Sequence, residues 1–171
     1  KGTKVAVIGL GSMGFGMATS LKRAGFDVTG CDVMAGAVEK LISLGGGGAA
    51  TPAEAAQDAA IVVSVVVNGA QTEAVLFGKD GAAKTMAPGA VFISSATMDP
   101  DVARRLAKQL EATGRHYLDA PISGGAQRAA QGELTILASG SASAFAKARP
   151  ALDAMAAQLY EPGDAPGLGA A

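Results

Sequence analysis

A glycine-rich corner between an apolar strand and a helix constrains the fold of this chain more than any other feature. The run Val5–Ile8 is apolar and mostly β-branched, which is typical of a strand buried on both faces. Residues 9–14 follow with the pattern G-x-G-x-x-G, and Phe15–Ala24 then has the spacing of a helix. Phe26–Cys31 predicts a second strand, which ends at Asp32. Together these segments predict a complete βαβ unit.

Each glycine of this corner has a physical role in binding a dinucleotide. Gly9 permits a tight turn, Gly11 lets a pyrophosphate approach the backbone because it has no Cβ, and Gly14 lets the helix lie tightly on the sheet. The helix starts at the same place, so its free N–H groups and positive dipole end face the phosphates. The alternative to a dinucleotide site is that residues 9–14 form a glycine-rich turn in an α/β protein that has lost its ligand. The predicted cofactor-binding residues of the corner are Gly9, Leu10, Gly11, Ser12, Met13 and Gly14.

The carboxylate of Asp32 indicates which dinucleotide is favoured. At the tip of the second predicted strand it can accept hydrogen bonds from both hydroxyls of an adenosine ribose, whereas it repels a 2′-phosphate. The next residues, Val33, Met34 and Ala35, offer no cation to hold such a phosphate. We therefore expect Asp32 to bind the ribose of NAD rather than NADP.

Composition excludes several other classes of function. The chain has 171 residues, a net charge of −1 and 17% charged residues, so it lacks the electrostatic footprint for nucleic acid or an anionic membrane. A single histidine and the lack of a ligand cluster argue against a metal site. No apolar run reaches membrane-spanning length. The one cysteine, Cys31, is expected to be a small buried side chain in a reducing, cytoplasmic setting.

Strand and helix patterns alternate along the chain and predict an α/β fold, a Rossmann-type, doubly wound, mostly parallel sheet in a single domain. The strongest strand signal is Ala60–Val67, and shorter strands are expected at Ala49–Ala50 and Gln158–Glu161. Pro150 is expected to break the last helical segment. In such sheets ligands bind beyond the carboxyl ends of the strands. The segments that should meet at this edge are 9–14, 32, 67–68, 95–97 and 123–125.

Two segments resemble the signatures of the β-hydroxyacid dehydrogenase family. The first is the glycine corner with the residues up to Val28, and the second is Asp119–Gly125, which reads Asp-Ala-Pro-Ile-Ser-Gly-Gly. The two together at this separation are more specific than either alone, and the resemblance covers essentially the whole chain. Within the family, Cys31–Val33 and Val65–Glu73 are most similar to members that oxidise L-threonate, a four-carbon sugar acid.

The resemblance implies an oxidoreductase that transfers hydride between NAD and a short hydroxy acid. L-threonate or a related four-carbon sugar acid is the expected substrate, with 3-hydroxyisobutyrate or tartronate semialdehyde as alternatives. Residues 1–161 should form the NAD-binding domain, and residues 162–171 should begin the connection to an all-α domain that supports a homo-oligomer. The family's catalytic group is a Lys in a K-x-x-N pattern, which we expect beyond Ala171, so no catalytic residue is assigned within the chain.

The resemblance also implies roles for residues that follow other predicted strands. Thr97 should contact the nicotinamide half of the cofactor, or alternatively act as the N-cap of the next helix. The residues expected to line the cofactor cleft are Val66, Val67 and Asn68, of which Asn68 could instead be a strand-ending turn residue. The residues expected to hold the substrate carboxylate are Ser123, Gly124 and Gly125, which could instead form a strand-to-helix turn. A rival interpretation of the whole chain is a non-catalytic nucleotide-sensing module.

Overall fold

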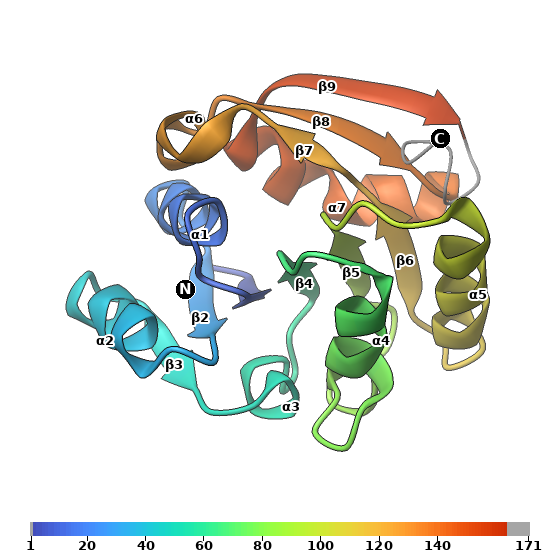
Figure 1. Cartoon of the computed structure of the whole chain (residues 1–171), viewed down its shortest axis with the longest axis horizontal. Helices are drawn as coiled ribbons and strands as arrows, with labels where there is room; N and C mark the ends of the chain where they lie inside the picture. The colour runs from blue at the N-terminus through green and yellow to red at the C-terminus, as the bar shows by residue number, and fades with distance from the viewer. Residues whose placement is uncertain (1, 164–171) are drawn as a thin grey trace.

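The computed structural model describes residues 2–163 and shows a mostly parallel β-sheet with helices on both faces (Figure 1). The strand order is β3-β2-β1-β4-β5-β6-β8-β7, and β9 pairs with β8 off this path. Strands β1 to β6 pair in parallel, which confirms the predicted doubly wound α/β fold. The strands are β1 (Lys4–Ile8), β2 (Asp27–Cys31), β3 (Gly47–Ala49), β4 (Ile61–Ser64), β5 (Val91–Ser94), β6 (His116–Asp119), β7 (Ile122–Ser123), β8 (Leu134–Ser139) and β9 (Ala156–Gly163).

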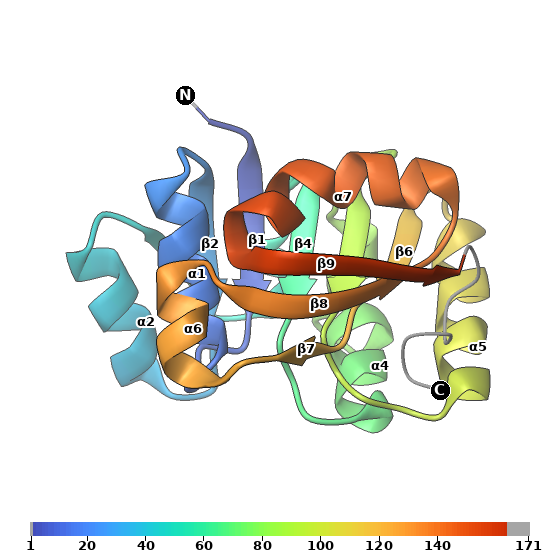
Figure 2. The same cartoon turned by 90° about the horizontal axis from the view of Figure 1, so that it is seen from above.

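The helices divide between two hydrophobic cores, one on each face of the sheet. Helices α1, α2 and α7 contribute Met17, Leu41 and Leu152 to one core, and the other is built around Phe92 and Tyr117 under α3, α4 and α5. Helix α7 also contacts the β8–β9 pair, which runs alongside it (Figure 2). The helices are α1 (Gly14–Arg23), α2 (Ala35–Ser43), α3 (Pro52–Ala55), α4 (Gly69–Phe77), the 3-10 helix η1 (Ala82–Lys84), α5 (Pro100–Glu111), α6 (Gly125–Gln131) and α7 (Ala142–Met155).

The carboxyl ends of the central strands lie in register. Ile8, at the end of β1, is the partner of Ser64 on β4, and Ser64 is the partner of Ser94 on β5. Because the strands end side by side, the segments that follow them leave the sheet at one edge. This alignment positions the candidate site.

Strand β4 is shorter than the predicted strand Ala60–Val67. It ends at Ser64, and Val65–Val67 continue beyond the sheet without a strand assignment. Val65 still donates its N–H to the Ile8 carbonyl at 2.7 Å, but Val67 is 77% exposed. Apolar sequence alone therefore overestimates the strand, since this segment leaves the buried sheet at the edge where a ligand would bind.

Strand β3 lies slightly earlier than the predicted Ala49–Ala50 and includes two glycines of the run at positions 45–48. Gly47–Ala49 pairs in parallel with Thr29–Cys31 of β2. A Cβ on Gly48 would lie 2.5 Å from Val38 and 2.8 Å from Ile42 on α2. The glycine is therefore required because α2 packs closely against this edge strand.

Helix α7 continues through Pro150, so the predicted break is wrong. Proline removes one backbone N–H and its ring crowds the carbonyl four residues earlier. Both Pro150 and that residue, Ala146, lie on the exposed side of the helix, where water can bind the freed carbonyl. The opposite face keeps the helix in place through Ala144, Ala148, Ala151, Leu152 and Met155, which are all buried.

Replacing Pro150 with alanine should therefore stabilise the chain. Pro150→Ala restores the missing backbone N–H and removes the crowding by the proline ring, which stabilises the folded helix. It also raises the conformational entropy of the unfolded chain, which offsets a smaller part of this gain. We therefore expect the free energy of unfolding to rise by about 1–2 kcal/mol. Urea denaturation monitored by circular dichroism measures the change. An unchanged or lower midpoint would show that the helix has already adapted to the proline.

The C-terminal part of the sheet contains two features that differ from expectation. The short strand β7 was not predicted, and it pairs antiparallel with β8. Strand β9 pairs in parallel with β8 and begins directly after α7, so it is longer than the predicted Gln158–Glu161. The predicted interdomain connection over residues 162–171 lies outside the described residues from 164 onward.

Candidate functional site

The glycine corner is a tight turn that only glycine can make at its first position. Gly9 has φ +99° and donates its N–H to the Cys31 carbonyl at 2.8 Å, which joins the end of β1 to the end of β2. A Cβ at this position would lie 2.3 Å from the Val65 carbonyl oxygen. Both the backbone conformation and the neighbouring strand therefore exclude a side chain here.

Gly14 is required for a different contact, at the start of α1. A Cβ there would lie 1.9 Å from the Gly9 carbonyl oxygen and 3.3 Å from the Val65 side chain. The predicted close packing is thus confirmed, and it joins the first turn of the helix to the corner and to the end of β4. Two residues later, a Cβ on Gly16 would lie 2.5 Å from the Ala130 nitrogen of α6.

Gly11 contrasts with the other two glycines of the motif. It is exposed, its φ lies outside the left-handed region, and an added Cβ would meet no atom of the described chain within 4 Å. Neither folding nor packing therefore requires glycine here. The space that Gly11 leaves open lies beside the first turn of α1, as a bound pyrophosphate would require.

Asp32 is held directly against this corner. Its Oδ1 accepts a hydrogen bond from the Leu10 N–H at 3.1 Å, and its Oδ2 accepts one from the Met34 N–H at 3.0 Å. The two bonds orient the carboxylate, and each oxygen keeps further acceptor capacity. Leu10 itself is buried, so its side chain belongs to the core and its backbone N–H is already engaged. The structure thus brings the glycine corner and Asp32 together, as predicted.

A cavity of about 330 Å³ lies at the carboxyl edge of the sheet and is lined by residues from several of the predicted segments. Asp32 lies outside this cavity and joins the corner through Leu10. Ser123, Gly124 and Gly125 do not line the cavity either, but they follow directly on Ile122, which does. The lining residues are Gly11, Ser12, Met13, Gly14, Val65, Val66, Val67, Ser95, Ala96, Thr97 and Ile122.

Capping interactions decide two of the structural alternatives. Asn68 is the N-cap of α4, since its Oδ1 accepts from the Gln71 N–H at 2.9 Å, while the Gln71 side chain accepts from the Val67 N–H at 2.8 Å. Asn68 therefore has a structural role at the start of α4. Helix α5 is capped by Asp99 and not by Thr97, so the capping alternative for Thr97 is wrong.

Thr97 is exposed between two adjoining cavities. It lines the cavity at the glycine corner and a second one, of about 430 Å³, between α4 and α5. Asn68 lines the second cavity, together with Glu73 and Arg105. These two side chains form an ion pair at 3.0 Å, and the hydrogen bond from Arg105 lowers the pKa of the Glu73 carboxyl.

Ser123, Gly124 and Gly125 connect β7 to α6, so the turn expected as an alternative is present. Gly124 has φ +139° and Gly125 has φ +84°, and both values favour glycine. All three residues are exposed. The turn geometry leaves them accessible to a ligand, and their assignment to the substrate stays a prediction.

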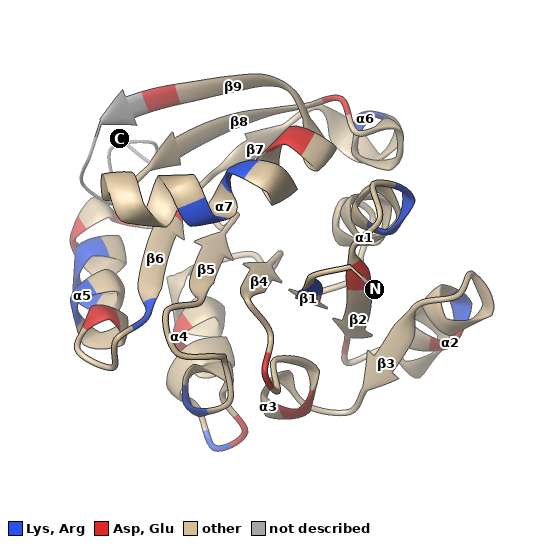
Figure 3. Ribbon diagram, turned by 180° about the vertical axis from the view of Figure 1, so that it is seen from behind, with Lys and Arg blue, Asp and Glu red and all other residues tan. Residues whose placement is uncertain are grey.

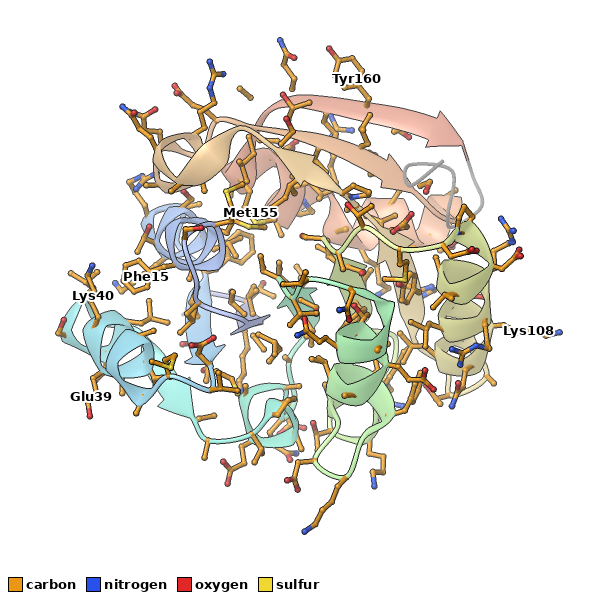
Figure 4. All side chains as sticks on the ribbon, in the orientation of Figure 1. Phe15, Glu39, Lys40, Lys108, Met155 and Tyr160 are labelled. Carbon is orange, nitrogen blue, oxygen red and sulfur yellow. The ribbon has the colours of Figure 1, made fainter. Side chains whose placement is uncertain are left out.

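Lys40 is a cation near the glycine corner that the sequence motif does not identify. It belongs to α2, and only the packing of α2 against α1 brings it close to the corner. A third cavity, of about 420 Å³, separates α1 from α2 and is lined by Gly11, Ser12, Phe15 and Lys40 among others. The Lys40 ammonium lies 4.9 Å from the Phe15 ring centre, and the two side chains extend toward each other in Figure 4.

The Cys31 thiol should be unreactive in the folded chain. Burial raises its pKa to about 11 from an ordinary value of 9.0, and the charges of Asp32 and Glu54 act in the same direction. At pH 8 this leaves about a hundredfold less thiolate than in a free cysteine. We expect iodoacetamide to alkylate the folded chain about a hundred times more slowly than the urea-unfolded chain. Equal rates would contradict the buried placement.

Figure 3 shows basic and acidic residues together on the same helices, as on α5. Within residues 2–163, no group of three or more His, Cys, Asp and Glu side chains could hold a metal ion. In the same range, no helix is both long and apolar enough to cross a membrane.

Comparison with known proteins identifies the family. The family described as the NAD binding domain of 6-phosphogluconate dehydrogenase matches residues 4–163. An L-threonate dehydrogenase of Cupriavidus necator is 48% identical over 165 residues, which are 96% of this chain and 56% of that protein. The chain thus spans little more than half the length of this relative.

Solved structures show the same fold. A 3-hydroxyisobutyrate dehydrogenase of Salmonella typhimurium superposes with a TM-score of 0.95 at 44% identity, covering 98% of this chain and 59% of that one. A Mycobacterium tuberculosis 3-hydroxyisobutyrate dehydrogenase described with L-serine gives 0.91 at 31% identity, covering 99% and 57%. With its glycine corner, Asp32 and parallel sheet, the chain belongs to the family of NAD-binding domains represented by that of 6-phosphogluconate dehydrogenase, as its resemblance to the β-hydroxyacid dehydrogenases implies.

Proposed function

We propose that this chain binds NAD at the carboxyl edge of its sheet and serves an oxidoreductase that moves hydride between NAD and a short hydroxy acid. The observation that carries the proposal is the contrast among the three glycines. Gly9 and Gly14 are required by the protein's own packing, whereas Gly11 leaves space that no residue of the described chain uses. The Asp32 carboxylate, bound to the Leu10 N–H, lies at the same corner.

NAD would lie across the carboxyl edge of the sheet, with its adenosine half at Asp32 and its nicotinamide at Thr97. Its pyrophosphate would lie on Gly11, Ser12 and Met13 at the start of α1, and its adenosine ribose would hydrogen-bond Asp32. Val66 and Val67 would provide an apolar wall, beside the cap formed by Asn68. The nicotinamide would then reach Thr97, which is exposed at the junction of two cavities. NAD supplies the hydride chemistry, and these residues would position it.

The substrate would lie on the far side of the nicotinamide, where Ser123, Gly124 and Gly125 would hold its carboxylate. L-threonate or a related four-carbon sugar acid is the preferred candidate, because the Cupriavidus relative carries that activity in its name. 3-Hydroxyisobutyrate is the second candidate, supported by the names of the two solved structures. We assign proton transfer to the part of the relatives that this chain does not match, and we infer assembly as a homo-oligomer in the cytoplasm.

Isothermal titration calorimetry with NAD tests the cofactor assignment. We expect one NAD per chain, with NADP binding at least about tenfold more weakly because Asp32 repels a 2′-phosphate. Bound NAD should also raise the melting temperature in a concentration-dependent way. Absence of NAD binding to the intact fold would refute the cofactor assignment.

Activity separates the enzyme from the non-catalytic alternative. The 171-residue chain alone should oxidise L-threonate negligibly, because the proton-transfer group is assigned to the unmatched part of the relatives. The full-length protein should oxidise it with NAD. A full-length protein that binds NAD but oxidises none of the candidate hydroxy acids would favour the nucleotide-sensing module.

A further inference from the structure

We propose that Arg128 determines specificity for an anionic substrate by pairing with the carboxylate held at Ser123, Gly124 and Gly125. The inference rests on the proposed function, since it names the residue that gives this same site its charge preference. Arg128 lies on α6, one turn after the loop, and is not part of the Asp119–Gly125 signature.

The Arg128 side chain lies against Gly124. An added Cβ on Gly124 would be 3.1 Å from Cδ and 3.2 Å from Cβ of Arg128. The stem of the arginine therefore occupies the space beside the loop that a larger residue at position 124 would need. Its guanidinium begins one bond beyond Cδ, so the cation starts next to the loop expected to bind the carboxylate.

The guanidinium is also available for a ligand. The guanidinium groups of five of the six arginines are bound by other groups of this chain. Arg23 and Arg115 donate to backbone carbonyls. The other three form ion pairs, Arg104 with Asp101, Arg105 with Glu73 and Arg149 with Asp153. Within residues 2–163, Arg128 is the arginine for which neither an ion pair nor a side-chain hydrogen bond is found. It is exposed, so its charge is accessible.

Helix α6 is held firmly enough to position this cation. Gly16 lets the α6 backbone approach α1 closely, and the Ser20 hydroxyl donates to the Ala129 carbonyl at 2.8 Å. The Arg23 guanidinium donates to the Ala130 carbonyl at 3.0 Å, and Ala129 is buried. These contacts hold the last turn of α6 on α1, so Arg128 extends from a packed helix rather than from a free loop.

The Arg128 guanidinium and the Ser123 hydroxyl are together complementary to the carboxylate of a hydroxy acid. A planar guanidinium can donate two parallel hydrogen bonds to a carboxylate, and it keeps its charge at all physiological pH values. The Ser123 hydroxyl adds a neutral donor on the same loop. A neutral amide of the same acid would lose the charge pairing with Arg128 but keep the hydrogen bond to Ser123. The site should therefore distinguish acids from their amides.

The test compares binding of L-threonate and of its neutral amide to the NAD-saturated 171-residue chain, followed by NMR titration of its backbone amides. We expect Arg128→Gln to weaken L-threonate binding about five- to tenfold and to leave the amide and NAD unaffected. Arg128→Lys should restore part of the difference, because it keeps the charge without the planar fork. Arg149→Gln is the matched control, since it removes an exposed arginine of α7 whose charge pairs with Asp153.

The outcomes separate this inference from the proposed function. If Ser123→Ala weakens L-threonate binding but Arg128→Gln does not, the role of Arg128 is overturned and the substrate site stands. If the NAD-saturated chain shows no saturable L-threonate binding, the substrate part of the proposed function fails, and this inference fails with it. Equal weakening of acid and amide by Arg128→Gln would indicate a structural role and would also overturn the inference.

Discussion

Gly11→Ala is expected to remove at least about 90% of the NAD affinity while leaving the free energy of unfolding unchanged or slightly higher. A tenfold loss corresponds to about 1.4 kcal/mol of binding free energy. The added methyl group meets no atom of the described chain within 4 Å, so the fold accommodates it. It would occupy the space where we place the pyrophosphate. Replacing glycine also restricts the unfolded chain, which favours folding by about 0.4–1 kcal/mol.

Gly14→Ala is the matched comparison, because it adds the same methyl group three residues later. There the Cβ would lie 1.9 Å from the Gly9 carbonyl oxygen, so the first turn of α1 or the corner must move. We expect a loss of about 3 kcal/mol in stability together with the loss of NAD binding. Urea denaturation and calorimetry on both variants separate the two effects. If Gly11→Ala bound NAD like the unaltered chain, the pyrophosphate would have to lie elsewhere.

The first third of the fold could be predicted because its determinants are local. The strand before the glycine corner, the helix after it and the acid at the second strand's end all follow from residues within one βαβ unit. Helix α7 could not be predicted in the same way. Whether Pro150 breaks a helix depends on which side faces water, and that is decided by the packing of α7 against the sheet.

Part of the geometry at this edge could be predicted from the sequence, and part could not. Asp32 and the glycine corner meet because parallel neighbouring strands end together, which is a general property of the fold. The cap formed by Asn68 and Gln71 has a local signal in the N-x-x-Q spacing, which a capping analysis of this segment would have found. Lys40 and Arg128 have no such signal, because their positions near the corner and near Gly124 depend on how α2 and α6 pack.

The double variant Asp32→Ser, Val33→Arg is expected to reverse the cofactor preference from NAD to NADP, a change of about a hundredfold in the ratio of affinities. The first change removes the carboxylate that repels a 2′-phosphate, and serine keeps an oxygen that can accept from the Leu10 or Met34 N–H. The second supplies a guanidinium for the phosphate. Val33 is 97% exposed, so arginine fits there without disturbing the core.

Asp32→Ala and Val33→Arg alone separate the loss of the carboxylate from the gain of the cation. Asp32→Ala should weaken NAD binding markedly, because the ribose loses its hydrogen-bond acceptor, and should narrow the discrimination against NADP. Val33→Arg alone should improve NADP binding only modestly, because the Asp32 carboxylate still repels the phosphate and pairs with the new cation. Calorimetric titration of the double variant and of both single variants with NAD and with NADP measures the six affinities. A double variant that still prefers NAD would mean that the adenosine ribose does not lie against Asp32, and the direction proposed for the cofactor across the sheet edge would then be wrong.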